Sequence, residues 1–343
     1  MISESTINKV RELSIEDVLE PYVRLSRKGS TLMGVCPFHE ERTGSFSVSP
    51  GKNLFHCFSC NRGGDAITFI MEKENLSFME AIEFLAKRHN ISIEYVEGQD
   101  KEQTAKIRHK ETLLATLGHV QDFFVGSLLV PDSDESRLAR EYAYGRWPEE
   151  FCSVAGIGYA PRDGGAFMEF CRTKGLDEDV LFELGLLRRG DDGRVYTMFR
   201  HRIMIPIRNR WGRIIAYTAR YIGNSPNAPK YINSPNSAVY AKGECLFGID
   251  RASRERNAEY FIIVEGAPDV LRMQSVGYDN TVAALGTAWT DSQFELLKKY
   301  TSSLCFIPDS DVSDGKPFGP GFEAVMANGT AAVRKGFHVT VRE

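Results

Sequence analysis

The sequence has 343 residues, of which 42% are hydrophobic and 26% charged, a composition typical of a globular protein with two or three domains. It contains no run of about 18 apolar residues, so we expect no membrane-spanning helix. The N-terminus lacks the basic and apolar regions of a signal peptide, which predicts a cytoplasmic protein. Seven scattered cysteines, an odd number, do not indicate a disulfide framework.

The net charge of −4 conceals an uneven distribution of charged residues. Residues 188–256 carry 14 Lys and Arg against 5 Asp and Glu, a balance of +9. Such a basic stretch is expected of a protein that binds a phosphate backbone. The alternative is an ordinary basic face in contact with solvent.

The N-terminal region predicts a small domain of short helices and strands. Ser14 and Asp17 form a capping-box pattern that opens a helix before Pro21. Asp65 is expected to open a third helix, and Ser77 with Glu80 to cap a fourth. Short apolar segments separated by turns predict small antiparallel strands at residues 32–35, 45–48 and 53–56.

Four metal-ligand residues lie in this region with the spacing of two knuckles. Cys36 and His39 are separated by two residues, as are Cys57 and Cys60, and seventeen residues separate the pairs. Two such knuckles can close a tetrahedral structural Zn²⁺ site. His56 is the competing ligand. Aromatic and basic residues around the knuckles predict a surface on which bases stack, although several phenylalanines must form the core: Phe38, Arg42, Phe46, Lys52, Phe55, Phe58 and Arg62.

The middle of the chain begins with a polar stretch. Residues Glu97 to Thr104 predict a linker, which we place at residues 97–110. A long helix follows and ends before Pro131. Residues 202–207 and 213–219 are strand-like, and residues 209–212 between them predict the turn of a hairpin.

The C-terminal region alternates strands with helices. The expected strands are 261–264, 281–284, 303–307 and 338–341; Thr290 and Gln293 cap one intervening helix, and another lies near Glu323. This alternation predicts an α/β domain with a parallel sheet.

Acidic residues directly follow two of these strands. Glu265 follows the first, and Asp309 and Asp311 follow the third. Because ligands bind at the carboxyl ends of strands in open α/β sheets, these carboxylates predict a Mg²⁺ site. Asp269 is a candidate to orient Glu265 or to bind metal through water. The alternative is that these acids cap the helices that follow.

The ordered motifs resemble a known family. The Cys36, His39, Cys57 and Cys60 ribbon resembles the CHC2-type zinc domain of bacterial DnaG-type primases. The segments 202–208 and 230–235 resemble the amino-terminal part of the primase core, and Leu285-Gly286-Thr287 also matches that family. Val264-Glu265-Gly266 with Asp269, followed by Asp309-Ser310-Asp311, resembles the Toprim domain. The resemblance covers nearly the whole chain in family order.

The resemblance implies primer synthesis on single-stranded DNA from ribonucleoside triphosphates. It implies that the zinc domain recognises template and that Glu265, Asp309 and Asp311 hold catalytic Mg²⁺ or Mn²⁺. The implied template or nucleotide contacts are Arg202, Arg220, Lys230 and Lys242, with Arg146 a looser match. Arg208, Arg210 and Arg213 have two interpretations: they contact template or nucleotide, or they are hairpin charges in contact with solvent. A replicative helicase is an implied partner, but the domain that binds it is absent here.

The expected architecture is an α+β multidomain protein. Residues 1–96 would form the zinc domain, 111–257 the basic amino-terminal part of the core, and 258–343 an incomplete Toprim domain. The family's Glu-Gly-Tyr-Met-Asp pattern is Glu-Gly-Ala-Pro-Asp at residues 265–269, and residues 312–320 resemble an insertion. The later Asp-Pro-Asp motif is missing before Glu343, which indicates a fragment, a truncated gene or a shortened form with weak or no activity. This divergence suggests a primase of the mobile-element type.

Two other functions remain as alternatives. The first is a catalytically silent zinc protein that binds single-stranded DNA. The second is a Toprim nuclease or topoisomerase. The topoisomerase requires a catalytic tyrosine domain for which the sequence offers no place, and a nuclease does not explain the primase-like middle.

Overall fold

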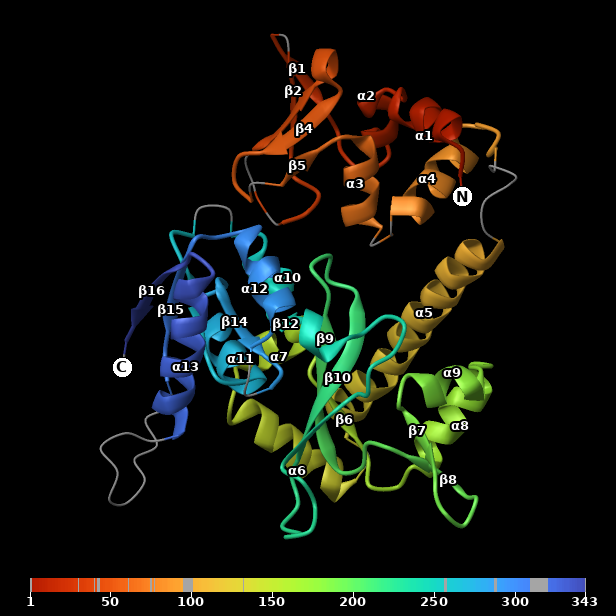
Figure 1. Ribbon diagram of the computed structural model, residues 1–343. Coiled ribbons are helices and arrows are strands. Elements are labelled where there is room, and N and C mark those ends of the chain that lie inside the picture. The colour runs from red at the N-terminus through yellow and green to blue at the C-terminus, as the bar shows by residue number, and fades with distance from the viewer. Residues whose placement is uncertain are drawn as a thin grey trace. The chain divides into compact units, whose positions relative to one another are not determined.

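The computed structural model describes residues 2–29, 31–39, 41, 44–60, 62–74, 76, 78–94, 101–131, 133–255, 258–286, 289–308 and 320–342. The chain forms two compact units, Met1–Ile107 and Arg108–Glu343, and each is described by itself (Figure 1).

The first unit is an antiparallel five-stranded sheet with four helices. The strands follow chain order across the sheet: β1 (Ser26–Lys28), β2 (Thr31–Gly34), β3 (Phe46–Ser49), β4 (Leu54–Cys57) and β5 (Gly63–Gly64). The helices are α1 (Glu4–Arg11), α2 (Ile15–Leu19), α3 (Ala66–Lys73) and α4 (Phe78–Arg88). Phe46, Phe55 and Phe69 are buried and lie 5.2–6.1 Å apart in ring-to-ring contacts. This aromatic core joins α3 to the sheet. The pairing of β2 with β3 and of β3 with β4 confirms the antiparallel strands predicted from the sequence.

The start of α2 differs from the capping box predicted at Ser14, because the Ser14 side chain makes no capping hydrogen bond. The amide of Ile15 instead donates to Oδ1 of Asn53, 2.8 Å away. The Asn53 amide group donates to the carbonyls of Leu13 (2.9 Å) and Arg11 (3.2 Å). Asn53 itself has φ of +55°, a conformation that Asn tolerates better than most residues. A residue far along the chain therefore caps this helix. Asp65 caps α3 as predicted, with Thr68 N donating to its side chain, whereas Ser77 lies outside the described residues.

Replacing Asn53 should destabilise the first unit. Asn53→Ala leaves the Ile15 amide without its acceptor and strains the left-handed backbone, which together should cost about 1–3 kcal/mol. Asn53→Gly relieves the backbone strain but still lacks the hydrogen bonds, so it should cost less. Urea unfolding of the zinc-loaded chain measures both changes, and an alanine variant as stable as the parent would contradict this interpretation.

The long helix α5 (Lys101–Leu129) spans the boundary between the two units, and its larger part, from Arg108 on, belongs to the second unit. The helix includes residues 101–110, which the sequence pattern predicts as part of the linker; residues 97–100 lie outside the described part. Residues Ala105–Leu129 are long and apolar enough to cross a membrane by length and composition. However, one face of α5 packs into the core of the unit, with Leu113, Leu117, Val120, Phe124 and Leu128 buried.

A four-stranded antiparallel sheet packs on α5, in the order β11-β10-β9-β6. The predicted hairpin is confirmed by β9 and β10, which pair from Arg202↔Tyr221 to Ile214↔Arg208. The elements of this part are α6 (Asp134–Tyr144), α7 (Glu149–Ala155), β6 (Gly158–Ala160), α8 (Gly165–Thr173), α9 (Glu178–Glu183), β7 (Leu187–Arg189), β8 (Val195–Thr197), β9 (Arg202–Arg208), β10 (Ile214–Tyr221) and β11 (Tyr231–Asn233).

The C-terminal part contains a five-stranded sheet in the order β12-β14-β13-β15-β16. Its elements are η2 (Lys242–Glu244), β12 (Leu246–Phe247), α10 (Ile249–Ala252), β13 (Phe261–Ile263), α11 (Ala267–Ser275), β14 (Thr281–Ala284), α12 (Asp291–Lys298), β15 (Ser303–Phe306), α13 (Pro320–Arg334) and β16 (His338–Val341). Four strands are parallel as predicted, whereas β12 pairs antiparallel with β14. The sheet is therefore mixed. The Thr290–Gln293 capping box is present in full.

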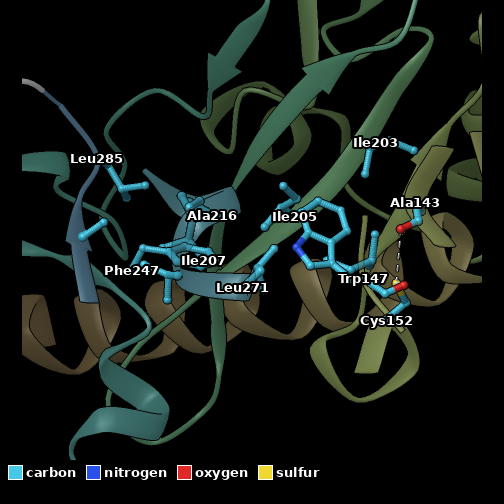
Figure 2. Packing of buried hydrophobic residues seen from close by; sticks show 14 of the residues in the cluster. Ala143, Trp147, Cys152, Ile203, Ile205, Ile207, Ala216, Phe247, Leu271 and Leu285 are labelled. Atoms are coloured by element: carbon cyan, nitrogen blue, oxygen red, sulfur yellow. Dashed lines mark hydrogen bonds between the residues drawn. The ribbon is translucent and has the colours of Figure 1, made fainter. Parts of the chain in front are cut away.

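A continuous hydrophobic cluster joins the four-stranded and five-stranded sheets of the second unit (Figure 2). Ile205 and Ile207 of β9 lie in it together with Trp147, Phe247 and Leu271. All five side chains are at most 5% exposed. Because packed cores resist deformation, this cluster fixes the β9–β10 sheet relative to the parallel strands.

Candidate functional site

The four predicted zinc ligands converge in the first unit. Their ligand atoms all lie within 4.8 Å of one another. Cys36 Sγ lies 3.7 Å from Cys60 Sγ, and Cys57 Sγ lies 4.0 Å from His39 Nδ1. Ligand atoms around a tetrahedral zinc are about 3.8 Å apart, so the donor set and its spacing fit Zn²⁺. His56, the competing ligand, is not in the cluster and instead lies edge-on to Phe58.

The cluster is partly buried, and burial changes the pKa of the Cys36 thiol. Burial, with smaller effects from the neighbouring thiols, raises the pKa of Cys36 to about 12. A hydrogen bond from the Cys60 amide reaches Cys57 Sγ at 3.4 Å. Buried thiols this close together are typical of a site that is deprotonated by a bound cation.

The aromatic residues around the knuckles divide between core and surface. Phe46 and Phe55 are buried, and Phe38 packs against the same core. Arg62 lies over the Phe38 ring at 4.8 Å. Phe58 is 71% exposed, so its ring lies at the surface. Arg42 lies outside the described residues.

Glu265 lies where two parallel strands end side by side. β13 and β15 pair from Phe261↔Leu304 to Ile263↔Phe306, and Ile307 N continues the ladder by donating to Ile263 O at 2.9 Å. β14 pairs with one side of β13 and β15 pairs with the other side, so the order of the strands reverses at β13. Such a reversal in strand order is where open α/β sheets bind ligands. Glu265 is exposed at this point.

Among the other predicted acids, Asp269 has a structural role of its own. Asp269 Oδ2 accepts a hydrogen bond from Gly266 N at 3.1 Å at the start of α11, which is the capping role considered as its alternative. Asp309 and Asp311 lie outside the described residues. β15 ends at Phe306, three positions before Asp309.

A basic and aromatic group lies on β10, β11 and α6 of the same unit. The Arg220 guanidinium lies over the rings of Tyr142 (5.4 Å) and Tyr231 (5.3 Å), and its Nε donates to the Tyr142 hydroxyl. Arg146, which is exposed, also lies over the Tyr142 ring, at 5.1 Å. Among the described residues, Arg220 Nη1 is buried and makes no hydrogen bond. A cationic donor held between two rings and left without an acceptor suits an anionic ligand.

Burial raises the pKa of Tyr231, and the charges of Arg220, Arg146 and Asp269 also act on it. Tyr142 and Tyr231 were not predicted as site residues. Tyr231 lies within the family-like segment 230–235, whereas nothing in the sequence around Tyr142 singles it out.

The remaining predicted contacts comprise two exposed lysines and one buried arginine. Lys230 and Lys242 are exposed. A Cβ placed on Gly286 would lie 3.4 Å from Lys242 Nζ, so the lysine reaches the segment that follows β14. Arg202 is only 5% exposed and donates to the carbonyls of Pro229 (2.9 Å) and Ala219 (3.3 Å). Arg202 therefore holds the segment before Lys230 to the sheet from inside the protein.

The hairpin arginines have partners of their own. Arg208 donates to Gly212 O at 2.9 Å, and Arg213 forms a 2.8 Å ion pair with Glu111. Arg210 lies over the exposed Trp211 ring at 4.1 Å. These contacts leave Arg146, Arg220, Lys230 and Lys242, here called the basic cluster, as the predicted cations at the site.

Three family models match the chain in order. They are the CHC2 zinc finger at residues 2–101, the N-terminal domain of the DNA primase catalytic core at 127–253, and a Toprim-like domain at 262–319. Together they agree with the motifs from which the family was inferred.

Relatives and solved structures give the same assignment. The chain is 31% identical to a DNA primase of Staphylococcus aureus over 99% of its own length, but it spans only 56% of that protein. It resembles the crystal structure of the zinc-binding and RNA polymerase domains of the Aquifex aeolicus primase (34% identity, TM-score 0.63), covering 99% of this chain and 79% of that one. It also resembles a DnaG primase catalytic domain bound to single-stranded DNA (28% identity, TM-score 0.58), covering 68% and 74% of the two chains. The chain belongs to the DnaG-type family of bacterial DNA primases.

Proposed function

We propose that the chain provides the template-binding and nucleotidyl-transfer parts of a primase, which makes short RNA primers on single-stranded DNA from ribonucleoside triphosphates. One observation supports the proposal: Glu265 and the basic cluster belong to the same unit, whose two larger sheets share one hydrophobic core. Carboxylates suit hard cations and a guanidinium suits phosphate oxygens, so this unit has the groups that a nucleotide and its metal require.

Each of these residues would have a distinct role. Glu265, with Asp309 and Asp311, would hold Mg²⁺ or Mn²⁺, which when bound stabilises the charge that develops as a 3′-hydroxyl attacks an α-phosphate. Arg220, oriented by Tyr142 and Tyr231, would contact a phosphate. Lys230, Lys242 and Arg146 would add positive charge along the template or nucleotide. Arg202 would support this surface through its carbonyl contacts.

The first unit would hold one structural zinc through Cys36, His39, Cys57 and Cys60, and would read template in part through the exposed Phe58. We place the protein in the cytoplasm, at the replication fork. We propose a replicative helicase as a further partner.

Binding to single-stranded DNA should be salt-sensitive. If the basic cluster contacts about four phosphates, the slope of log K against log salt should be on the order of −3. Lys230→Ala should make that slope shallower by about 0.7, since it removes one phosphate contact. Fluorescence anisotropy of labelled oligonucleotides over a salt series measures both slopes.

Lys174→Ala is the matched control, because Lys174 is an exposed lysine at the end of α8 and is not in the basic cluster. It should leave the slope unchanged. Two results would count against the proposed template surface. One is a DNA affinity that does not change with salt concentration, and the other is an equal slope of log K against log salt for Lys230→Ala and the parent. Labelled ribonucleotide incorporation tests the reaction itself, and cleavage of the DNA instead would favour a Toprim nuclease.

A further inference from the structure

A single carboxylate lies behind the four zinc ligands. Glu41 Oε1 accepts hydrogen bonds from the backbone amides of Cys36 (2.8 Å) and Ser45 (2.9 Å). Glu41 Oε2 accepts from the Ser45 hydroxyl at 2.5 Å and lies 3.2 Å from His39 Nε2. The Glu41 side chain is only 9% exposed. Glu41 therefore contacts two of the four ligand residues directly.

Ser45 extends these contacts to the second knuckle. Its hydroxyl lies 3.1 Å from Cys57 Sγ, and its carbonyl accepts from the Phe58 amide at 3.0 Å. Through Glu41 and Ser45, the loop after the first knuckle is joined to the strand end that carries the second. The two knuckles are seventeen residues apart in the sequence, so this connection fixes their spacing.

The orientation of His39 follows from the same contacts. Its Nδ1 faces Cys57 Sγ, while its Nε2 faces Glu41. A histidine ligand needs one ring nitrogen free to bind metal, and a carboxylate on the other nitrogen selects that tautomer and makes the ligand more basic. Outer carboxylates of this kind typically change metal affinity by about 10–100-fold.

We propose that Glu41 is a positioning residue for the zinc site, which orients His39 and, with Ser45, sets the distance between the two knuckles. This inference rests on the zinc site proposed above. A carboxylate that only stabilised the loop would instead change the unfolding of the chain without changing the metal's surroundings.

The test compares Glu41→Ala, Glu41→Gln and Ser45→Ala in the full chain. Zinc affinity is measured by competition with a chelator, and the visible spectrum of the Co²⁺-substituted protein reports the ligand geometry. Glu41→Ala should weaken zinc binding about 10–100-fold. Glu41→Gln keeps the shape and the acceptor oxygen but loses the charge, so it should weaken binding less while shifting the Co²⁺ spectrum. Ser45→Ala should weaken binding without removing the contact with His39.

Glu83→Gln is the matched control, since Glu83 is an exposed carboxylate on α4 of the same unit; it should match the parent in every measurement. Zinc affinity and Co²⁺ spectra of the Glu41 variants that equal those of the parent would overturn the inference while leaving the zinc site intact. If Glu41→Ala does not fold, Glu41→Gln alone decides between these results. Failure of the parent chain to bind zinc would overturn the zinc site and this inference together.

Discussion

Removal of zinc is expected to unfold the first unit and to leave the second folded. Cys36 and Cys57 are 4% and 0% exposed and belong to the core of the first unit. Losing the cation removes a binding free energy of about 10 kcal/mol or more, which for a small zinc domain is folding free energy. The described cores of the second unit contain only residues from Leu113 onward, and none of the four ligands.

Hydrogen exchange read by mass spectrometry locates this effect. After treatment with a chelator, amides of residues 2–94 should exchange rapidly, while those of β9, β10 and β13 should keep their protection. Cys57→Ser should give the same pattern without chelator. Cys171→Ser, at a buried cysteine outside the cluster, should not. Equal protection of the first unit with and without zinc would show that the metal is not needed for its fold.

Replacing Glu265 should abolish ribonucleotide polymerisation while leaving template binding nearly unchanged. Glu265→Gln keeps the shape of the side chain but removes its charge. Losing one carboxylate ligand of a catalytic cation should lower the rate about 100-fold or more, a barrier change of about 3 kcal/mol. Asp309→Ala should do the same. The basic cluster is untouched in both variants, so DNA affinity should stay close to that of the parent.

Glu259→Gln provides the matched control for this prediction. Glu259 precedes β13 at its amino end, opposite to the end at which Glu265 lies. Its replacement removes the same charge beside the same strand and should not change the rate. Primer synthesis by Glu265→Gln at the rate of Glu259→Gln would mean that Glu265 is not a metal ligand.

The zinc cluster could be predicted from the sequence because it depends on a local pattern. The knuckle spacing of Cys36, His39, Cys57 and Cys60 determines a closed site almost regardless of the rest of the fold. Likewise, the position of Glu265 after a parallel strand could be predicted, because a run of continuous apolar residues precedes it. Its role as a metal ligand stays a prediction. The strands at residues 281–284 and 338–341 were predicted with the bounds that the structure has.

Contacts between distant segments could not be predicted in this way. Arg220 lies between Tyr142 of α6 and Tyr231 of β11 only because the cores of the second unit bring these elements together. Asn53 caps α2 across the first unit, which a local capping pattern at Ser14 cannot reveal. The phenylalanines near the knuckles look alike in sequence, and only the fold separates the buried Phe46 from the exposed Phe58.

Primer synthesis tests the central claim most directly. The chain, and a longer protein that completes the length of its relatives, would be given single-stranded DNA, labelled ribonucleoside triphosphates and Mg²⁺, and the products separated by size. We expect short oligoribonucleotides that require both template and divalent cation, at least from the longer protein, and their loss in Glu265→Gln. No oligoribonucleotides from either protein, or undiminished synthesis by Glu265→Gln, would contradict the assignment of this edge as a primase active site.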